Sequence, residues 1–247
     1  MRGLLKRRWW IVLTAFVVAV VALGWVGATV LASMRTAEFW ESAIADFEEQ
    51  DRESPPEPGA ILFTGSSSIR MWGSLAEDMT PLRVLNRGFG GSHIDHVSHY
   101  ASRIVTPYRP RAIVLYAGDN DLSKGTGKTP ESVLADFRHF VGFVHGALPG
   151  TPVYFVAIKP SLSRWDRWPA MRDANQRIAA WAKETEGVEY LDVATPMLGP
   201  DGEPRSELFV IDGLHLSDEG YEVWTEVVRP VLMGRFGDTK KKEGDQG

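Results

Sequence analysis

Short apolar runs alternate with helical stretches along most of this chain. The runs end at Gly, Pro or Asn and predict strands at 60–64, 82–85, 112–116, 153–158 and 188–191. The stretches between and after them predict helices near 92–104, 130–147, 169–186 and 217–233. Continuously apolar strands separated by helices are typical of a parallel sheet that is covered on both faces. The pattern therefore predicts one α/β domain over residues 60–236, with its ligands beyond the carboxyl ends of the strands.

The N-terminal residues have a different pattern. Four basic residues, Arg2, Lys6, Arg7 and Arg8, precede a run from 9 to 34 that contains no charged side chain. As a helix, 26 residues at about 1.5 Å each would span roughly 39 Å, more than the roughly 30 Å of bilayer hydrocarbon. We therefore expect residues 1–8 to form a cytoplasmic basic segment and residues 9–34 to form a transmembrane signal-anchor helix.

The distribution of positive charge predicts the orientation of this anchor. The basic residues precede the run and only Arg35 directly follows it, which favours a cytoplasmic N-terminus and an extracytoplasmic catalytic domain on a single-pass protein of the cell membrane. A cleaved signal peptide with a site near 30–32 is the alternative. The length of the run argues against it, because the apolar region of a signal peptide usually has only about 7–15 residues.

Two segments flank the predicted domain. Residues 35–59 contain an amphipathic helix at 38–50, followed by a proline-rich connector at 51–59. Residues 237–247 are polar and poor in apolar side chains, so we expect a disordered tail.

Composition excludes several classes of protein. The formal net charge of −5 argues against a nucleic-acid partner, which usually requires a basic surface. The chain has no cysteine, so disulfide frameworks, thiolate metal sites and a cysteine nucleophile are excluded. The sequence makes no prediction about oligomeric state.

Four polar clusters lie where ligands of a parallel sheet are expected. Three follow the first three strands and the fourth precedes the last helix: 65–68 (GSSS), 86–92 (NRGFGGS), 118–121 (GDND) and 212–215 (DGLH). Two nucleotide-binding interpretations fail on spacing. A dinucleotide fingerprint would need glycine at His93, and a P-loop ending at 127–129 would need glycine at Leu122.

Together the four clusters fit acyl transfer. A serine at a strand end exposes its hydroxyl, and Asp212, three residues before His215, allows one turn to supply a base and the carboxylate that orients it. The backbone N–H groups of Ser67 and Gly91 and the side-chain amide of Asn120 would come from neighbouring strand ends to bind the developing oxyanion.

These clusters resemble, in order and spacing, the conserved blocks of the SGNH hydrolases, the GDSL-like lipases and esterases. The resemblance covers roughly residues 60–235, and it implies Ser67, Asp212 and His215 as the catalytic triad, with Gly91 and Asn120 as oxyanion donors. Ser66 stands where the family usually has aspartate, so three adjacent serines compete for the nucleophile. Counting from the glycine favours Ser67, with Ser66 and Ser68 as the alternatives.

The resemblance also implies a fold. It is a flavodoxin-like three-layer sandwich with a five-stranded parallel sheet in 2-1-3-4-5 order, which agrees with the strand count above. No Gly-x-Ser-x-Gly elbow occurs, so the α/β-hydrolase fold is disfavoured.

Two further groups have a claim to function. His93, His96 and His99 recur every third residue, a spacing that winds around a helix, so we predict no metal site and assign His93 to the substrate groove at most. The segment 159–168, rich in Arg and Trp, is either a surface loop that packs its tryptophans on the core or a lip that selects part of the substrate.

The sequence thus predicts a serine esterase that acts on short-chain acyl or acetyl esters of lipids or glycans, without cofactor or metal. The alternatives are an O-acyltransferase that uses the same triad and a non-catalytic binding module on the same scaffold.

Overall fold

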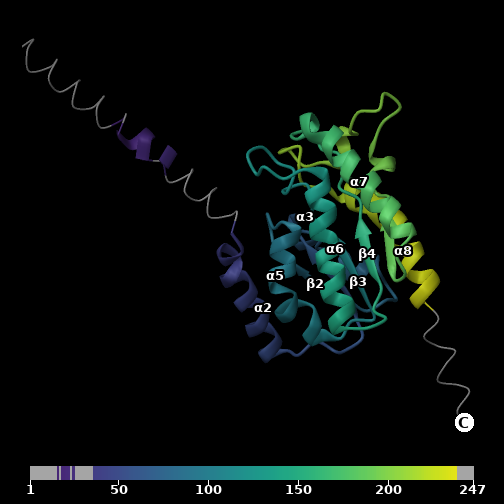
Figure 1. Cartoon of the computed structure of the whole chain (residues 1–247). Coiled ribbons are helices and arrows are strands. Elements are labelled where there is room, and N and C mark those ends of the chain that lie inside the picture. Colours follow the sequence, from purple (N-terminus) through teal and green to yellow (C-terminus); the bar gives the residue numbers. More distant parts are fainter. Residues whose placement is uncertain (1–15, 17, 23, 26–35, 238–247) are drawn as a thin grey trace, which may run out of the picture. The chain divides into compact units, whose positions relative to one another are not determined.

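The computed structural model describes residues 36–237 together with residues 16, 18–22, 24 and 25 (Figure 1). Two compact units, Met1–Phe39 and Trp40–Gly247, make up the chain. Most of the predicted anchor at 9–34 lies outside the described residues, as does the predicted tail from 238 onward; the described residues between 16 and 25 are helical. Within the described residues, no helix combines the length and hydrophobicity that crossing a bilayer requires.

Five parallel strands form one sheet in the second unit. The strands are β1 (Ile61–Gly65), β2 (Val84–Gly88), β3 (Ala112–Tyr116), β4 (Val153–Val156) and β5 (Val188–Leu191). Their order is β2-β1-β3-β4-β5, and every pair is parallel. The predicted parallel sheet and its strand order are therefore confirmed.

Helices cover both faces of the sheet. One face carries α5 (Ile94–Ile104), α6 (Pro130–Ala147) and α7 (Trp168–Lys183), with α2 (Glu41–Glu53) packed against α5 (Figure 1). The other face carries α3 (Ser67–Arg70), α4 (Leu75–Asp78) and α8 (Asp218–Phe236). Short 3₁₀ helices complete the chain: η1 (Ala37–Trp40), η2 (Thr106–Tyr108), η3 (Trp165–Arg167), η4 (Thr195–Met197) and η5 (Ser206–Leu208).

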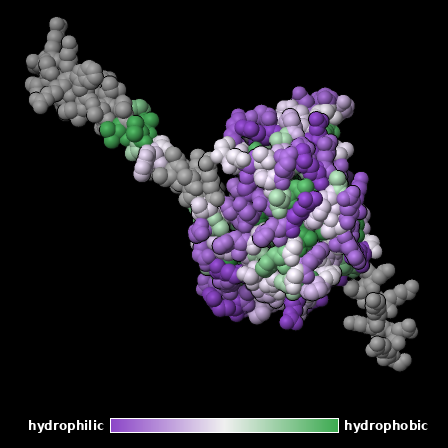
Figure 2. Space-filling view, viewed as in Figure 1, coloured by the Kyte–Doolittle hydropathy of each residue, from purple (hydrophilic) through white to green (hydrophobic). Residues whose placement is uncertain are grey.

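Aromatic side chains fill the two layers between sheet and helices. On the α8 side, Trp224 packs against Tyr116 of β3 with ring centroids 4.8 Å apart and against Trp72 at 5.8 Å. On the opposite side, Phe137 of α6 packs on Phe155 of β4 at 4.7 Å. The face of this unit seen in Figure 2 is mostly hydrophilic.

The second strand begins later than predicted. Residues 82–83 lie outside it, whereas Asn86 and Arg87, predicted to lie in the loop, pair in register with Phe63 and Thr64 of β1. A polar strand end is stable here because the buried Arg87 guanidinium binds Asp51 and Tyr108.

Asp51, the partner of Arg87, also lies in a helix rather than in the predicted connector. Asp51 was expected to open an irregular proline-rich segment, but α2 continues through Glu53, and the Asp51 carboxylate accepts hydrogen bonds from Arg87 and Tyr108. The network joins α2, β2 and η2. Its loss would leave a guanidinium in an interior position without its counter-charge.

We predict that Asp51→Ala lowers the free energy of unfolding by about 3 kcal/mol, because Arg87 would stay buried without its carboxylate. Denaturant unfolding of the full-length chain measures this. Glu57→Ala is the matched control, since it removes the carboxylate of the exposed Arg83–Glu57 pair and should cost less than about 1 kcal/mol. Equal losses in the two variants would contradict a structural role of the buried network.

Candidate active site

A glycine at the end of β1 positions the first predicted site residue. Gly65 has φ of +128°, and a Cβ atom there would lie 1.8 Å from the carbonyl oxygen of Tyr116 on β3. The next residue, Ser66, donates its N–H to that same oxygen at 2.8 Å. Only glycine permits this approach and this backbone conformation, so the chain leaves the sheet here and Ser67 becomes the first residue of α3.

Three predicted residues form a continuous chain of hydrogen bonds. Ser67 Oγ lies 3.0 Å from His215 Nε2, and His215 Nδ1 lies 2.5 Å from Asp212 Oδ2. The other carboxylate oxygen, Oδ1, accepts the backbone N–H groups of Leu214 at 2.8 Å and His215 at 2.9 Å. The structure thus brings together residues that are 148 positions apart in the sequence. Their order in the chain of hydrogen bonds is the one that a nucleophile, a base and its orienting carboxylate require.

The electrostatics of Asp212 determine which nitrogen of His215 can act as a base. Burial would raise the pKa of Asp212, but hydrogen bonds from the His215 side chain and from the backbone of His215 and Leu214 outweigh it and lower the pKa to about 2. Because an ionised carboxylate only accepts hydrogen bonds, His215 Nδ1 carries the proton and Nε2 is free to accept the Ser67 hydroxyl.

The three adjacent serines differ in their surroundings. Ser66 and Ser68 are 0% and 1% exposed, whereas Ser67 is 9% exposed and its Oγ faces His215. Burial removes the neighbouring hydroxyls from contact with a substrate. Of the three candidates, the structure therefore brings only Ser67 to the imidazole.

Gly91 and Asn120 lie in the loops that follow β2 and β3, the two strands that flank β1. The Asn120 side-chain amide donates to the carbonyl of Ser92 at 3.2 Å, and Asp121 accepts the N–H of Ile94 at 3.2 Å. These hydrogen bonds connect the two loops at the carboxyl ends of the strands, where Ser67 also lies.

Two charged residues that the sequence analysis did not single out also lie beside this site. Lys159 is 1% exposed, with Nζ 3.4 Å from Asp119 and 3.2 Å from the hydroxyl of Tyr116. Arg164 donates to the side-chain oxygen of Asn120 at 3.0 Å. Both belong to the segment 159–168, so its beginning is buried against the site rather than exposed as a surface loop. Its position after β4 and its content of arginine and tryptophan, which predict either a loop packed on the core or a substrate lip, were the signals in the sequence.

Two of the three histidines were expected to point in different directions, and this expectation is wrong. His93 precedes α5 with an extended backbone, so its ring stacks on His96 with centroids 4.5 Å apart. Together with Asp95 they bring three potential ligand atoms within 4.8 Å of one another.

The surrounding hydrogen bonds do not fit a metal at this cluster. His96 Nδ1 faces the N–H groups of Trp40 and His93, each at 3.2 Å, so the ring proton lies on Nε2, the nitrogen that would have to bind the ion. Asp95 is already paired with Lys128 at 2.9 Å.

Comparison with known protein families gives a match over most of the chain. A family model described as the GDSL-like Lipase/Acylhydrolase family matches residues 54–223. No curated protein matches significantly in sequence.

Several solved structures share the fold. A structure from Streptococcus pneumonia whose description names platelet activating factor has a TM-score of 0.70 at 22% identity, covering 86% of this chain and 99% of its own. A GDSL-like lipase from Bacteroides thetaiotaomicron has a TM-score of 0.64 at 16% identity, covering 82% and 99%. A catalytic mutant of an acetylxylan esterase from Geobacillus stearothermophilus has a TM-score of 0.53 at 15% identity, covering 69% and 94%.

The burial of His93 predicts acid sensitivity. Burial, followed by the charges of His96 and Lys128, lowers the pKa of His93 to about 4, so the native ring is neutral while an unfolded one gains a proton below about 6.5. The stabilisation is complete above about pH 6.5 and is lost as the pH falls toward 4, by up to about 3 kcal/mol. We expect His93→Asn, which retains a helix-capping side chain, to flatten the fall of unfolding free energy between pH 7 and 4. Replacing the exposed His139 with Asn should leave that slope unchanged; equal slopes in all three proteins would contradict the prediction.

Proposed function

Since the chain belongs to the GDSL-like lipase/acylhydrolase family, we propose that it is a serine esterase that hydrolyses carboxylic esters through an acyl-enzyme on Ser67. The observation that carries this proposal is the unbroken hydrogen-bond chain from Asp212 through His215 to Ser67. The esterases and lipases among the structural neighbours support the same class of reaction.

The proposed reaction follows from the positions of the protons. As Ser67 Oγ bonds to the ester carbonyl carbon, His215 Nε2 takes the hydroxyl proton, and the Asp212 carboxylate stabilises the resulting imidazolium. The carbonyl oxygen becomes an oxyanion, which the N–H groups of Ser67, Gly91 and the Asn120 amide bind. When the C–O bond to the alcohol breaks, the leaving oxygen receives the proton from His215. Water then repeats the sequence on the acyl-enzyme and releases the acid.

The backbone supports the role of Ser67 as an oxyanion donor. As the first residue of α3, Ser67 has an N–H group with no partner inside its own helix. One lost oxyanion donor typically costs about a hundredfold to a thousandfold in kcat, so three convergent donors would supply a large part of the catalysis.

We also propose that the substrate carries an apolar group. Leu162, Val210 and Ile211, here called the apolar rim, are 43%, 41% and 107% exposed. Val210 donates its backbone N–H to the carbonyl of His215 at 3.0 Å, and Ser163 donates to Gly213 at 3.0 Å, so the rim lies on two connected loops beside the triad. Among short-chain acyl or acetyl esters of lipids or glycans, the rim therefore favours substrates with an acyl chain or a lipid portion.

The proposed location is outside the cytoplasm, on a membrane anchor at residues 9–34. The charge-free run of 26 residues and the basic residues that precede it support this proposal.

We predict that Ser67→Ala lowers kcat on p-nitrophenyl acetate more than about a thousandfold, because among the described residues Ser67 supplies the hydroxyl that is hydrogen-bonded to His215 Nε2. The measurement compares the full-length protein with Ser67→Ala, and labelling with a fluorophosphonate should map to Ser67. Ser66→Ala and Ser68→Ala are the matched controls and should retain activity within a few-fold. A folded wild type that neither turns over nor labels would refute the esterase proposal. Labelling of Ser67, together with transfer of the acyl group of the p-nitrophenyl ester only to an added alcohol and not to water, would establish an acyltransferase.

The apolar rim yields a prediction about chain length. Ile211→Ser should lower kcat/KM for p-nitrophenyl octanoate about five- to tenfold more than for the acetate, because an octanoyl chain has apolar surface to bury against the rim and an acetyl group has almost none. The acetate rate of the same variant is the internal control. A constant octanoate-to-acetate ratio would exclude the rim from substrate binding.

A further inference from the structure

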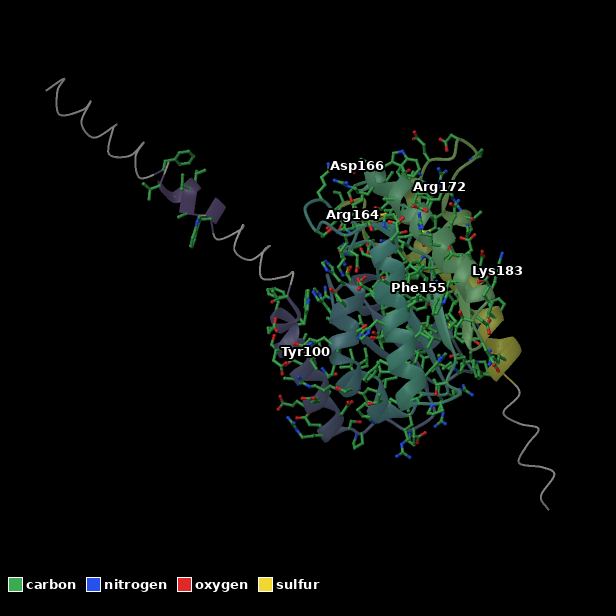
Figure 3. All side chains as sticks on the ribbon, viewed as in Figure 1. Tyr100, Phe155, Arg164, Asp166, Arg172 and Lys183 are labelled. Carbon is green, nitrogen blue, oxygen red and sulfur yellow. The ribbon has the colours of Figure 1, made fainter. Side chains whose placement is uncertain are left out.

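The segment after β4 reaches across to the loop after β3 through one side chain. Arg164 Nη2 donates to Asn120 Oδ1 at 3.0 Å, and Nη1 lies 3.2 Å from Asp119 Oδ2. Figure 3 shows Arg164 near Asp166, at the end of α7 opposite Lys183. One guanidinium thus contacts two consecutive side chains of the block that contains the proposed oxyanion donor.

This contact determines how the Asn120 amide is oriented. A carboxamide can turn by 180° with little change in shape, which exchanges its oxygen and its nitrogen. A guanidinium has only donors, so the side that faces Arg164 must be the oxygen. The NH₂ group therefore points to the opposite side, where one N–H bonds to the carbonyl of Ser92 at 3.2 Å and the second remains for a ligand.

Arg164 is itself held from the buried side. Asp119 is 2% exposed, and its Oδ1 accepts the backbone N–H of Asn120 at 3.0 Å while Oδ2 faces Arg164 and Lys159. Burial would raise the pKa of Asp119, but the two neighbouring cations outweigh it and lower the pKa, so the carboxylate stays ionised. The guanidinium is therefore fixed in a charged network.

We propose that Arg164 is a positioning residue that presents the Asn120 N–H to the oxyanion. It does so by fixing the amide oxygen with a charge-assisted hydrogen bond, which also polarises the amide and makes its N–H a stronger donor. The proposal rests on the proposed esterase function and gives the segment 159–168 a part in it.

The decisive experiment is a double-mutant cycle in the full-length protein. Arg164→Met, which keeps the length but removes the donors, should lower kcat on p-nitrophenyl acetate about ten- to a hundredfold and leave KM within about twofold. The affinity for a trifluoromethyl ketone, whose adduct carries the oxyanion, should fall by the same factor as kcat. Asn120→Ala should lose more, and the double variant should lose no more than Asn120→Ala alone.

Arg167→Met is the matched control, because Arg167 lies on the same segment and pairs with Asp166 instead. An Arg164→Met enzyme that behaves like this control, or a double variant whose losses multiply, would overturn the proposal. Should Arg164→Met fail to fold, Arg164→Lys takes its place in the cycle. Lysine keeps the positive charge but can reach only one of the two acceptors, so a partial loss of kcat is expected. The double variant with Asn120→Ala should again lose no more than Asn120→Ala alone.

A second readout separates this proposal from the esterase function. The side-chain NH₂ signals of Asn120 in a ¹⁵N–¹H spectrum are assigned by their loss in Asn120→Ala. They should shift in Arg164→Met and remain in place in Arg167→Met, whether or not the wild type hydrolyses an ester. Unshifted signals in Arg164→Met would overturn the positioning role, whereas shifted signals without any turnover would leave that role intact and refute the esterase function.

Discussion

The contact between the backbones of β1 and β3 at Gly65 is the constraint on which the site depends. A strand that continued straight would carry the following serines along the sheet and leave them paired with neighbours. At Gly65 the chain instead takes a conformation with positive φ against the Tyr116 carbonyl. Ser67 therefore leaves the sheet at the carboxyl end of β1. The loops after β2 and β3 are the nearest neighbours of that edge, which is why Gly91 and Asn120 lie in them.

Much of the fold was predictable because each strand bears its own signal. The apolar runs at 112–116 and 188–191 match β3 and β5 in full, since these strands end where polar or glycine-rich loops begin. The end of β2 was not predictable, because Arg87 can lie in a strand only when Asp51, 36 positions earlier, neutralises it. Asp212 and His215 could be paired from their spacing alone. The contact between Arg164 and Asn120 could not, since it joins two loops whose relative position only the assembled sheet defines.

The loops around Ser67 support one another rather than standing singly. The loop after β2 is tied to the loop after β3 through Ser92 and Asn120, and the latter is tied to the segment after β4 through Asp119 and Arg164. The same segment is joined to the loop before α8, because the backbone N–H of Ser163 donates to the carbonyl of Gly213. Dipoles held in this way need not reorient when charge develops on a substrate, which is the physical basis of electrostatic preorganisation.

The position of His215 directly before α8 links the proposed chemistry to the order of synthesis and folding. α8 is fastened by Trp224, which packs against Trp72 and Tyr116, and by the Tyr221 hydroxyl, which donates to the Ser68 carbonyl at 3.0 Å. Ser67 emerges from the ribosome about 150 residues before its base, as the separation of 148 positions between them requires. During that interval the serine has no base and behaves as an ordinary alcohol. Under the proposed mechanism the serine is therefore activated only after the segment before α8 has reached the site, so a chain in which this segment is missing or unfolded would carry no reactive nucleophile.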